Sequence, residues 1–368
     1  MNDSRDLIGP RPTDNDLLVS GLNLLRKCLP DTWDLGSPVP EHVDTAAQNT
    51  AIVRSPTGEV AQLIIETRQL LEPRDVPRVL EQLSVARADS GRDATVPSVG
   101  LVVSRYLTRS TQARLREAGM SYVDATGNFL LRSDSPAVFL SGQGGAKDPW
   151  RGPGRSPGNL KGEPAAKIVR TLADFPGPWK ARDLTMRSGA STGSVYRVVD
   201  FLESEGIATR DQQGLISIRD WEPMLRRWSE DYQFIETNQV TRWIAPRGLE
   251  AFLEAVRKST LGDYAITASV AAESWASYAP LRSAMIYTST PEAAADEWGL
   301  RQTDAGANVL LAHPAYDVVF ERSWTRSDGL QIAAPSQVAV DLMTGPGRAP
   351  AEAEELVRWM RHNEQLWR

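Results

Sequence analysis

Apolar and polar positions in the first 145 residues follow two different periods. Apolar residues at every third or fourth position, typical of a helix with one buried face, mark 15–29, 73–88 and 109–119. Alternating or continuous apolar runs, typical of strands, mark 49–55, 60–68, 99–104, 120–125, 128–133 and 137–141. The first two of these runs read as a hairpin around Pro56-Thr57-Gly58. This order predicts an α/β domain over 1–145, in which helices flank a sheet.

Glycine and proline interrupt both periods after this domain. The segment 141–164 contains seven Gly and four Pro, which neither propagate a helix nor pair in the middle of a sheet. We therefore predict a basic, Gly/Pro-rich linker over 146–163. Its Lys and Arg residues could follow a phosphate backbone, but solubility is the simpler explanation for them.

Three short helical patterns follow the linker. The first, 165–175, stops at Pro176-Gly177-Pro178, and the second, 181–189, ends at Gly189, a favoured residue after a helix. Ser191 then supplies an N-cap for a third helix over 192–206. The apolar stripe of this helix is formed by Val195, Val198, Val199 and Leu202.

A hairpin completes this part of the chain, because strands 207–210 and 215–218 can pair across 211–214. Three helices followed by a hairpin is the order of a winged helix-turn-helix, which we predict over 164–220. In that fold the third helix enters the major groove of DNA with its N-terminus first.

Helices alternate with short strands after residue 220. Expected helices cover 221–236, 248–258, 269–278, 335–344 and a last segment from Pro350 onward. Expected strands cover 264–268, 283–289, 308–312 and 316–321. The pattern predicts a C-terminal α/β domain over 221–368, so the fold class of the whole chain is α+β and multidomain.

Charge is segregated along the chain. The 368 residues have a net charge of −6 and a sequence pI of about 5.4, which argues against indiscriminate coating of nucleic acid. Between residues 147 and 219, however, twelve Lys/Arg stand against eight Asp/Glu, a net charge of +4 that leaves −10 for the remainder. The basic segment coincides with the expected winged helix, so the sequence predicts local DNA binding.

The expected DNA contacts lie on the second and third helices and on the hairpin. Arg197, one turn into the third helix, can reach a guanine with two hydrogen bonds or contact a phosphate. Tyr196 can bind a phosphate or pack. The remaining candidates are Arg182, Arg187, Ser191, Thr192, Ser194, Arg210, Gln212 and Gln213. We expect Arg210, Gln212 and Gln213 at the tip of the hairpin. The acids Asp200, Glu203 and Glu205 fall at the far end of the helix, where they would face away from DNA.

Three segments resemble a known family: "GASTGSVYRVVDFLESEG", "SIRDWEPMLRRW" and "APSQVAVDLMTGPGRAPAEAEELVRWM". Together they are similar to the AbiEi-type antitoxins and transcriptional regulators of actinobacteria over roughly residues 165–368. The resemblance implies a winged helix joined to a C-terminal domain, repression by DNA binding, autoregulation and a toxin partner. The N-terminal extension is absent from the simplest members of that group.

The N-terminal sheet is similar to the restriction-endonuclease-like fold in its strand order and in "LIIETR" and "DATGN". That chemistry needs an Asp on one strand and an acidic residue, a spacer and Lys on the next, to hold Mg²⁺. Here Glu66-Thr67-Arg68 replaces the second element, and 49–55 contains no Asp. Arginine keeps its proton and lacks the compact charge of lysine. We interpret Glu66 and Arg68 as a surface pair, Asp124 as a turn residue, and the domain as a degenerate nuclease fold.

The C-terminal domain resembles a nucleotidyltransferase in a degenerate form. That reaction needs Gly-Ser before a strand with two alternate carboxylates, whereas Ala268-Ser269 stands here and 284–290 contains no carboxylate. The single cysteine, Cys28, excludes an internal disulfide and a cysteine-based metal cage. The three histidines are scattered along the chain. We therefore expect no catalytic residue, no metal site and no cofactor.

These features predict a cytoplasmic, sequence-specific DNA-binding transcriptional regulator, a repressor of antitoxin type, with double-stranded DNA as its partner. A toxin or other protein partner and a homodimer are further expectations. No apolar run approaches the roughly 20 residues that span a membrane, and the N-terminus lacks the apolar region of a signal peptide. Two alternatives stay open. One is a metal-dependent nuclease that the winged helix targets to DNA, and the other is an adaptor whose winged helix binds protein.

Overall fold

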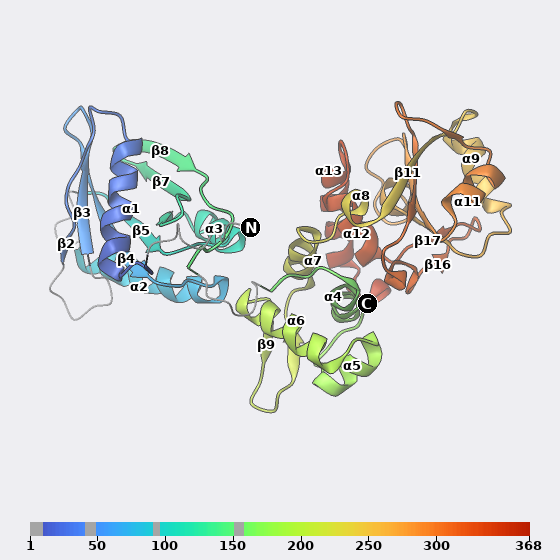
Figure 1. Cartoon of the computed structure of the whole chain (residues 1–368), viewed down its shortest axis with the longest axis horizontal. Coiled ribbons are helices and arrows are strands. Elements are labelled where there is room, and N and C mark those ends of the chain that lie inside the picture. The colour runs from blue at the N-terminus through green and yellow to red at the C-terminus, as the bar shows by residue number, and fades with distance from the viewer. Residues whose placement is uncertain (1–9, 41–48, 91–95, 151–157) are drawn as a thin grey trace, which may run out of the picture. The chain divides into compact units, whose positions relative to one another are not determined.

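The computed structural model describes residues 10–40, 49–90, 96–150 and 158–368. Its contacts divide the chain into two compact units (Figure 1). The N-terminal unit contains Met1–Ser156 with Ser204–Gly206, and the C-terminal unit contains Pro157–Glu203 with Ile207–Arg368. The finer domain boundaries predicted at 145, 163 and 220 stay predictions.

An eight-stranded sheet forms the centre of the N-terminal unit in the described residues. Its strands are β1 (Asp34–Leu35), β2 (Val39–Pro40), β3 (Asn49–Arg54), β4 (Val60–Arg68), β5 (Ser98–Ser104), β6 (Ser121–Asp124), β7 (Phe129–Asp134) and β8 (Ala137–Gly142). They lie in the order β1-β3-β4-β5-β6-β7-β8, with β2 beside β3. The three central strands β4, β5 and β6 run parallel, and the outer pairs run antiparallel.

Helices cover both faces of this sheet. Leu22 of α1 (Asp14–Cys28) packs in one core with Leu63 of β4. The opposite core contains Ile64, Leu83 of α2 (Val76–Ser90) and Leu115 of α3 (Arg109–Glu117), with the short 3₁₀ helix η1 (Pro73–Asp75) before α2. Successive strand residues point to opposite faces, so 63 and 64 enter different cores. The predicted helices and strands of this unit are confirmed.

The C-terminal unit begins with three helices, α4 (Glu163–Asp174), α5 (Ala181–Ser188) and α6 (Thr192–Ser204). Antiparallel strands β9 (Ala208–Arg210) and β10 (Ile216–Ile218) follow. Gly189 adopts φ +65° after α5, a conformation that favours glycine. The Ser191 hydroxyl accepts a hydrogen bond of 3.2 Å from the Ser194 N–H. Both predicted helix boundaries are therefore confirmed.

A curled seven-stranded sheet dominates the rest of this unit in the described residues (Figure 1). Its strands are β11 (Gln239–Ile244), β12 (Tyr264–Thr267), β13 (Ala284–Thr288), β14 (Arg301–Gln302), β15 (Val309–His313), β16 (Trp324–Thr325) and β17 (Gln331–Ile332). They lie in the order β14-β11-β15-β13-β12-β17-β16. The coarse prediction of a mixed α/β protein is confirmed by the two sheets and their helices.

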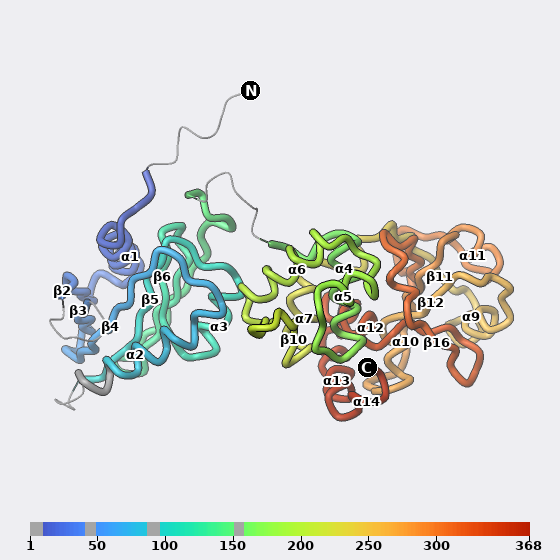
Figure 2. The backbone as a smooth tube through the Cα atoms, turned by 90° about the horizontal axis from the view of Figure 1, so that it is seen from below, coloured from blue at the N-terminus to red at the C-terminus, as the bar shows by residue number. Residues whose placement is uncertain are grey.

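Nine helical segments surround this second sheet in the described chain. They are α7 (Trp221–Ser229), α8 (Phe234–Thr237), α9 (Gly248–Arg257), α10 (Ala268–Ala272), α11 (Pro291–Glu297), the 3₁₀ helix η2 (Asp317–Phe320), α12 (Pro335–Met343), α13 (Ala349–His362) and α14 (Glu364–Trp367). Figure 2 shows α4 close to α5, and α4 also contacts α7, α12 and η2. One hydrophobic cluster extends from Leu160 to Trp367, so the three-helix segment shares its core with the sheet.

Three of the sequence predictions for this unit are wrong. The expected helix over 221–236 breaks between α7 and α8, where the Asp231 carboxylate accepts from Arg227 and from the Leu160 N–H. The expected strand over 316–321 contains η2 instead, and Arg170 binds the carbonyls of Val318 and Glu321. The expected helix over 269–278 ends at Ala272. In the first two cases, bonds to residues distant in the sequence hold the chain in a conformation that local patterns do not encode.

Candidate nucleic-acid interface

The N-terminus of α6 holds three of the predicted contact residues. Ser191 and Thr192 are exposed, whereas Ser194 is only 7% exposed. The Ser194 hydroxyl lies 3.0 Å from the Ser191 hydroxyl and accepts a bond of 3.1 Å from the Arg197 guanidinium. Ser194 therefore organises the start of the helix, and Ser191 and Thr192 are the exposed hydroxyl groups there.

Arg197 and Tyr196 lie on the exposed side of α6, while Val195, Val198 and Val199 of the predicted stripe are buried. The Arg197 Nε donates to the Gly193 carbonyl at 3.1 Å, which folds the side chain back along the first turn. Tyr196 is 48% exposed. The helix thus presents one cation and one phenol beside its N-terminus, where the helix dipole adds a partial positive charge.

The second helix adds two further arginines. Arg182 and Arg187 of α5 are both exposed, and the Arg187 guanidinium lies 3.9 Å from the centre of the Phe175 ring. This stacking holds Arg187 in place while it leaves its charge unneutralised. Among the described residues, none forms an ion pair with Arg182, Arg187 or Arg197.

The hairpin differs from the sequence expectation. Arg210, expected at the tip, lies at the end of β9 opposite Ile216. Its guanidinium pairs with Asp200 at 2.6 Å and with Glu203 at 3.1 Å. Asp200 and Glu203 therefore neutralise the charge of Arg210 within the protein.

The tip itself is formed by Gln212 and Gln213, which are exposed. The Asp211 carboxylate accepts bonds from the backbone N–H groups of Gln213 at 2.9 Å and Leu215 at 2.8 Å. This is an Asx-type turn that fixes the hairpin. Both glutamine side chains remain available for contacts with a ligand.

Glu66 and Arg68 of β4 form an ion pair in the N-terminal unit. Glu66 is 2% exposed, so its interpretation as half of a surface pair is wrong. Its carboxylate lies 2.6 Å from Arg68, whose guanidinium also donates to Gln82 at 2.8 Å. Burial raises the pKa of Glu66, and the neighbouring Arg68 opposes that rise. Within the described parts of the chain, no three His, Cys, Asp or Glu side chains cluster as metal ligands.

Asp124 has the structural role predicted for it. One carboxylate oxygen accepts from the N–H groups of Thr126 and Asn128 and from the Thr126 hydroxyl, at 2.7–3.1 Å. The other accepts from the Leu107 N–H at 3.0 Å and the Asn128 amide at 2.9 Å. The prediction of turn chemistry is confirmed, and both oxygens are engaged.

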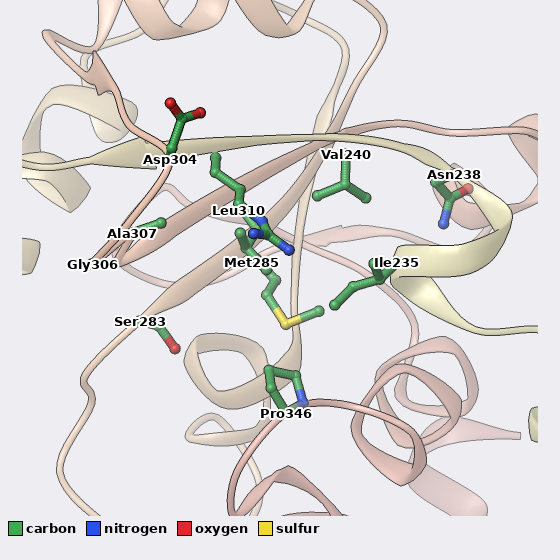
Figure 3. Close-up of a pocket in the computed structure, with 11 residues that line it drawn as sticks. Ile235, Asn238, Val240, Ser283, Met285, Asp304, Gly306, Ala307, Leu310 and Pro346 are labelled. Atoms are coloured by element: carbon green, nitrogen blue, oxygen red, sulfur yellow. The ribbon is translucent and has the colours of Figure 1, made fainter.

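Sequence reasoning missed a cavity of about 530 Å³ on the C-terminal sheet (Figure 3). Arg242, Met285 and Leu310 line it from three strands. The only sequence signal is the alternation in "QVTRWI" of β11, where Val240, Arg242 and Ile244 share one side. A second hollow of about 300 Å³ contains Ser269, whose hydroxyl donates to Glu352.

In comparisons with known proteins, no family model, no curated protein and no solved structure matches the chain. Within the described residues, no helix combines the length and apolar character needed to cross a membrane.

Proposed function

We propose that this protein is a sequence-specific DNA-binding transcriptional regulator, a repressor of the AbiEi antitoxin type. Its DNA-binding element is a winged helix-turn-helix composed of α4, α5, α6, β9 and β10. The observation that supports the proposal most is the set of three exposed arginines, Arg182, Arg187 and Arg197, to which the described structure assigns no carboxylate partner. Exposed basic groups without a carboxylate partner are available to bind the phosphates of a duplex.

In this proposal, the N-terminus of α6 enters the major groove. Arg197 reads a base edge, and Ser191 and Thr192 bind the adjacent phosphates. Arg182 and Arg187 of the preceding helix bind the backbone, and Gln212 and Gln213 bind the flanking segment. Dimerisation would place two such elements on successive turns of the duplex. We further propose that the N-terminal unit is a degenerate endonuclease-like fold that serves for contacts.

The experiment starts from duplexes that the purified chain enriches from random or genomic DNA. Arg197→Ala should weaken binding by about 1–3 kcal/mol, roughly fivefold to more than a hundredfold, if the arginine reads a base. Arg301→Ala is the matched control, because Arg301 is an exposed arginine on β14, outside the proposed winged helix. Equal affinities of the Arg197→Ala variant and the unaltered protein in a mobility shift would refute the groove assignment. A failure to enrich any duplex would favour the protein-binding adaptor.

A further inference from the structure

The cavity on the C-terminal sheet is lined by apolar side chains together with one cation, Arg242, and one acid, Asp304. Val240 and Arg242 come from β11, Leu310 from β15, Met285 from β13 and Ile235 from α8. In Figure 3 the ends of Met285 and Ile235 approach each other beside Pro346. Its volume of about 530 Å³ lies within the usual range for sites of small organic ligands, roughly 300–1,000 Å³.

Strand register explains why this part of the sheet lies open. Leu310 of β15 lies opposite Arg242 of β11 on one side and opposite Met285 of β13 on the other. The three side chains therefore share one face of the sheet. The opposite face holds the buried Trp243 and Ile286. Arg242 is exposed, and the described residues supply no ion-pair partner for it. The Asp304 carboxylate, also at the cavity, points away from Met285 and Pro346 (Figure 3).

We infer that this cavity is an effector site for a small organic anion with an apolar body. Arg242 would bind the anionic head, because a guanidinium donates two parallel hydrogen bonds to a carboxylate or sulfonate. Val240, Met285, Leu310 and Ile235 would contact the apolar body. A cationic ligand is disfavoured by Arg242, and a neutral one leaves that charge without a partner.

A buried chain of hydrogen bonds leads from the cavity wall to the first helix of the unit. Asn238, which lines the cavity, donates to the Tyr232 hydroxyl at 3.2 Å, and Tyr232 lies 2.7 Å from the Tyr287 hydroxyl. Tyr287 donates to Asp341 at 2.8 Å. Tyr287 is two residues from Met285 on β13, so both lie on the same face of the sheet.

The chain continues through α12 to α4. Gln337 donates to Asp341 at 3.0 Å and accepts from the Arg170 guanidinium at 3.1 Å. Every one of these side chains is buried, so a displacement at Asn238 or Tyr287 must be accommodated by its bonded neighbours. We therefore extend the inference: the bound anion changes the affinity for DNA. This extension rests on the proposed function, whereas the binding site itself does not.

A matched pair of fluorescent probes tests the site without DNA. 8-Anilino-1-naphthalenesulfonate has an anionic head on an aromatic body, and N-phenyl-1-naphthylamine is the same body without the sulfonate. Arg242→Gln should raise the Kd of the sulfonate about tenfold, as expected for loss of a charge-assisted bond, and leave the amine unchanged. Arg301→Gln is the control, because Arg301 lines a separate cavity of about 260 Å³. Equal effects of the two substitutions on the sulfonate would overturn the site.

A second variant separates recognition from folding. Ile235 is 39% exposed at the cavity, so Ile235→Glu should weaken the sulfonate by adding a like charge without disturbing the core. Sulfonate binding that survives this change would also overturn the site.

Regulation is then measured by mobility shift with saturating sulfonate. We expect the sulfonate to change the Kd for DNA at least about fivefold, the lower end of the usual coupling between linked sites, and to leave the Kd of the Arg242→Gln variant unchanged. Unchanged DNA affinity with intact probe binding would refute the coupling alone. If no duplex binds the protein at all, the proposed function fails, while the probe titrations still decide the site.

Discussion

Helices α4 and α6 each contain one central arginine, and the two arginines lie in opposite environments. The Arg170 side chain of α4 is fully buried and pairs with Asp174 at 2.9 Å. It also donates to Gln337 and to the carbonyls of Val318 and Glu321. Arg197 of α6 is exposed and bonds only to atoms of its own helix among the described residues. Both count equally in the net charge of the basic segment, but only Arg197 can meet a phosphate.

This difference corrects the charge argument made from the sequence. Of the twelve Lys/Arg between residues 147 and 219, Arg170 is buried where α4 meets α12 and η2. Arg210 is neutralised by two acids. The charge that could bind DNA therefore depends on the burial and ion pairing of individual side chains.

The largest effect is expected at Arg170. Arg170→Met leaves Asp174 buried without its cation and should lower the free energy of unfolding by about 3–5 kcal/mol. Arg197→Met, the control on α6, should stay within about 0.5 kcal/mol because it is a surface change. Denaturant unfolding followed by tryptophan fluorescence reports on this unit, since nine of the 11 tryptophans lie after residue 157.

A double variant distinguishes lost charge pairing from lost packing. Arg170→Met combined with Asp174→Leu removes both charges and should recover part of the lost stability, because no buried charge is left unpaired. Equal unfolding midpoints for Arg170→Met and the unaltered protein would show that the pair does not hold α4 against α12 and η2.

The next prediction concerns Asp341, which joins Arg170 through Gln337. Burial raises the pKa of the Asp341 carboxyl to about 7, although bonds from Thr267, Tyr287 and Gln337 and the charge of Arg170 oppose the rise. The folded state thus binds a proton that the unfolded state has released above about pH 4. Stability should fall between about pH 4 and about pH 7, by at most about 1.4 kcal/mol per pH unit.

Asp341→Asn tests the assignment, since the amide does not titrate. The difference in unfolding free energy between this variant and the unaltered protein should change across that pH window and level off above it. A constant difference from pH 4 to pH 8 would assign the titration to other groups.

Much of the fold was predictable because local chemistry decides it. Ser191 and Gly189 mark helix boundaries by hydrogen bonding and backbone preference, and the apolar periods located all nine secondary-structure elements predicted before the linker. The failures have two causes, one local and one distant in the sequence. β11 was missed because Arg242 interrupts the apolar positions Val240 and Ile244, and 316–321 was misassigned because Arg170 binds its carbonyls.

The candidate site was predictable in part for the same reason. The exposure of Arg197 follows from its position opposite the apolar stripe of α6. The pairing of Arg210 with Asp200 and Glu203 depends on how the hairpin folds back on the helix, which spacing along the sequence does not reveal. The cavity around Arg242 unites strands that are distant in the sequence, so only the assembled sheet shows it.

A smaller effect is expected in the salt dependence of DNA binding. Each phosphate contact contributes about −0.9 to the slope of log affinity against log salt. Arg182→Ala should therefore make the slope shallower by about 0.9, whereas Arg210→Ala should leave it unchanged. Titrations at several salt concentrations measure both variants. A slope that changes for Arg210→Ala and not for Arg182→Ala would reverse the distinction between paired and available arginines.

The last prediction is that no cleavage of DNA occurs, because the candidate acidic side chains of the N-terminal unit, Glu66 and Asp124, already have partners. Glu66 is buried against Arg68, and burial raises its pKa, which disfavours the ionised form that Mg²⁺ requires. The Asp124 oxygens are already occupied by five donors. Supercoiled plasmid incubated with the protein and Mg²⁺ or Mn²⁺ should therefore remain intact on a gel.

Cleavage that Glu66→Gln abolishes, and that Glu72→Gln preserves, would instead support the targeted nuclease. Glu72 is the suitable control because it also pairs with an arginine, Arg74, at 2.7 Å, but with 29% of its side chain exposed.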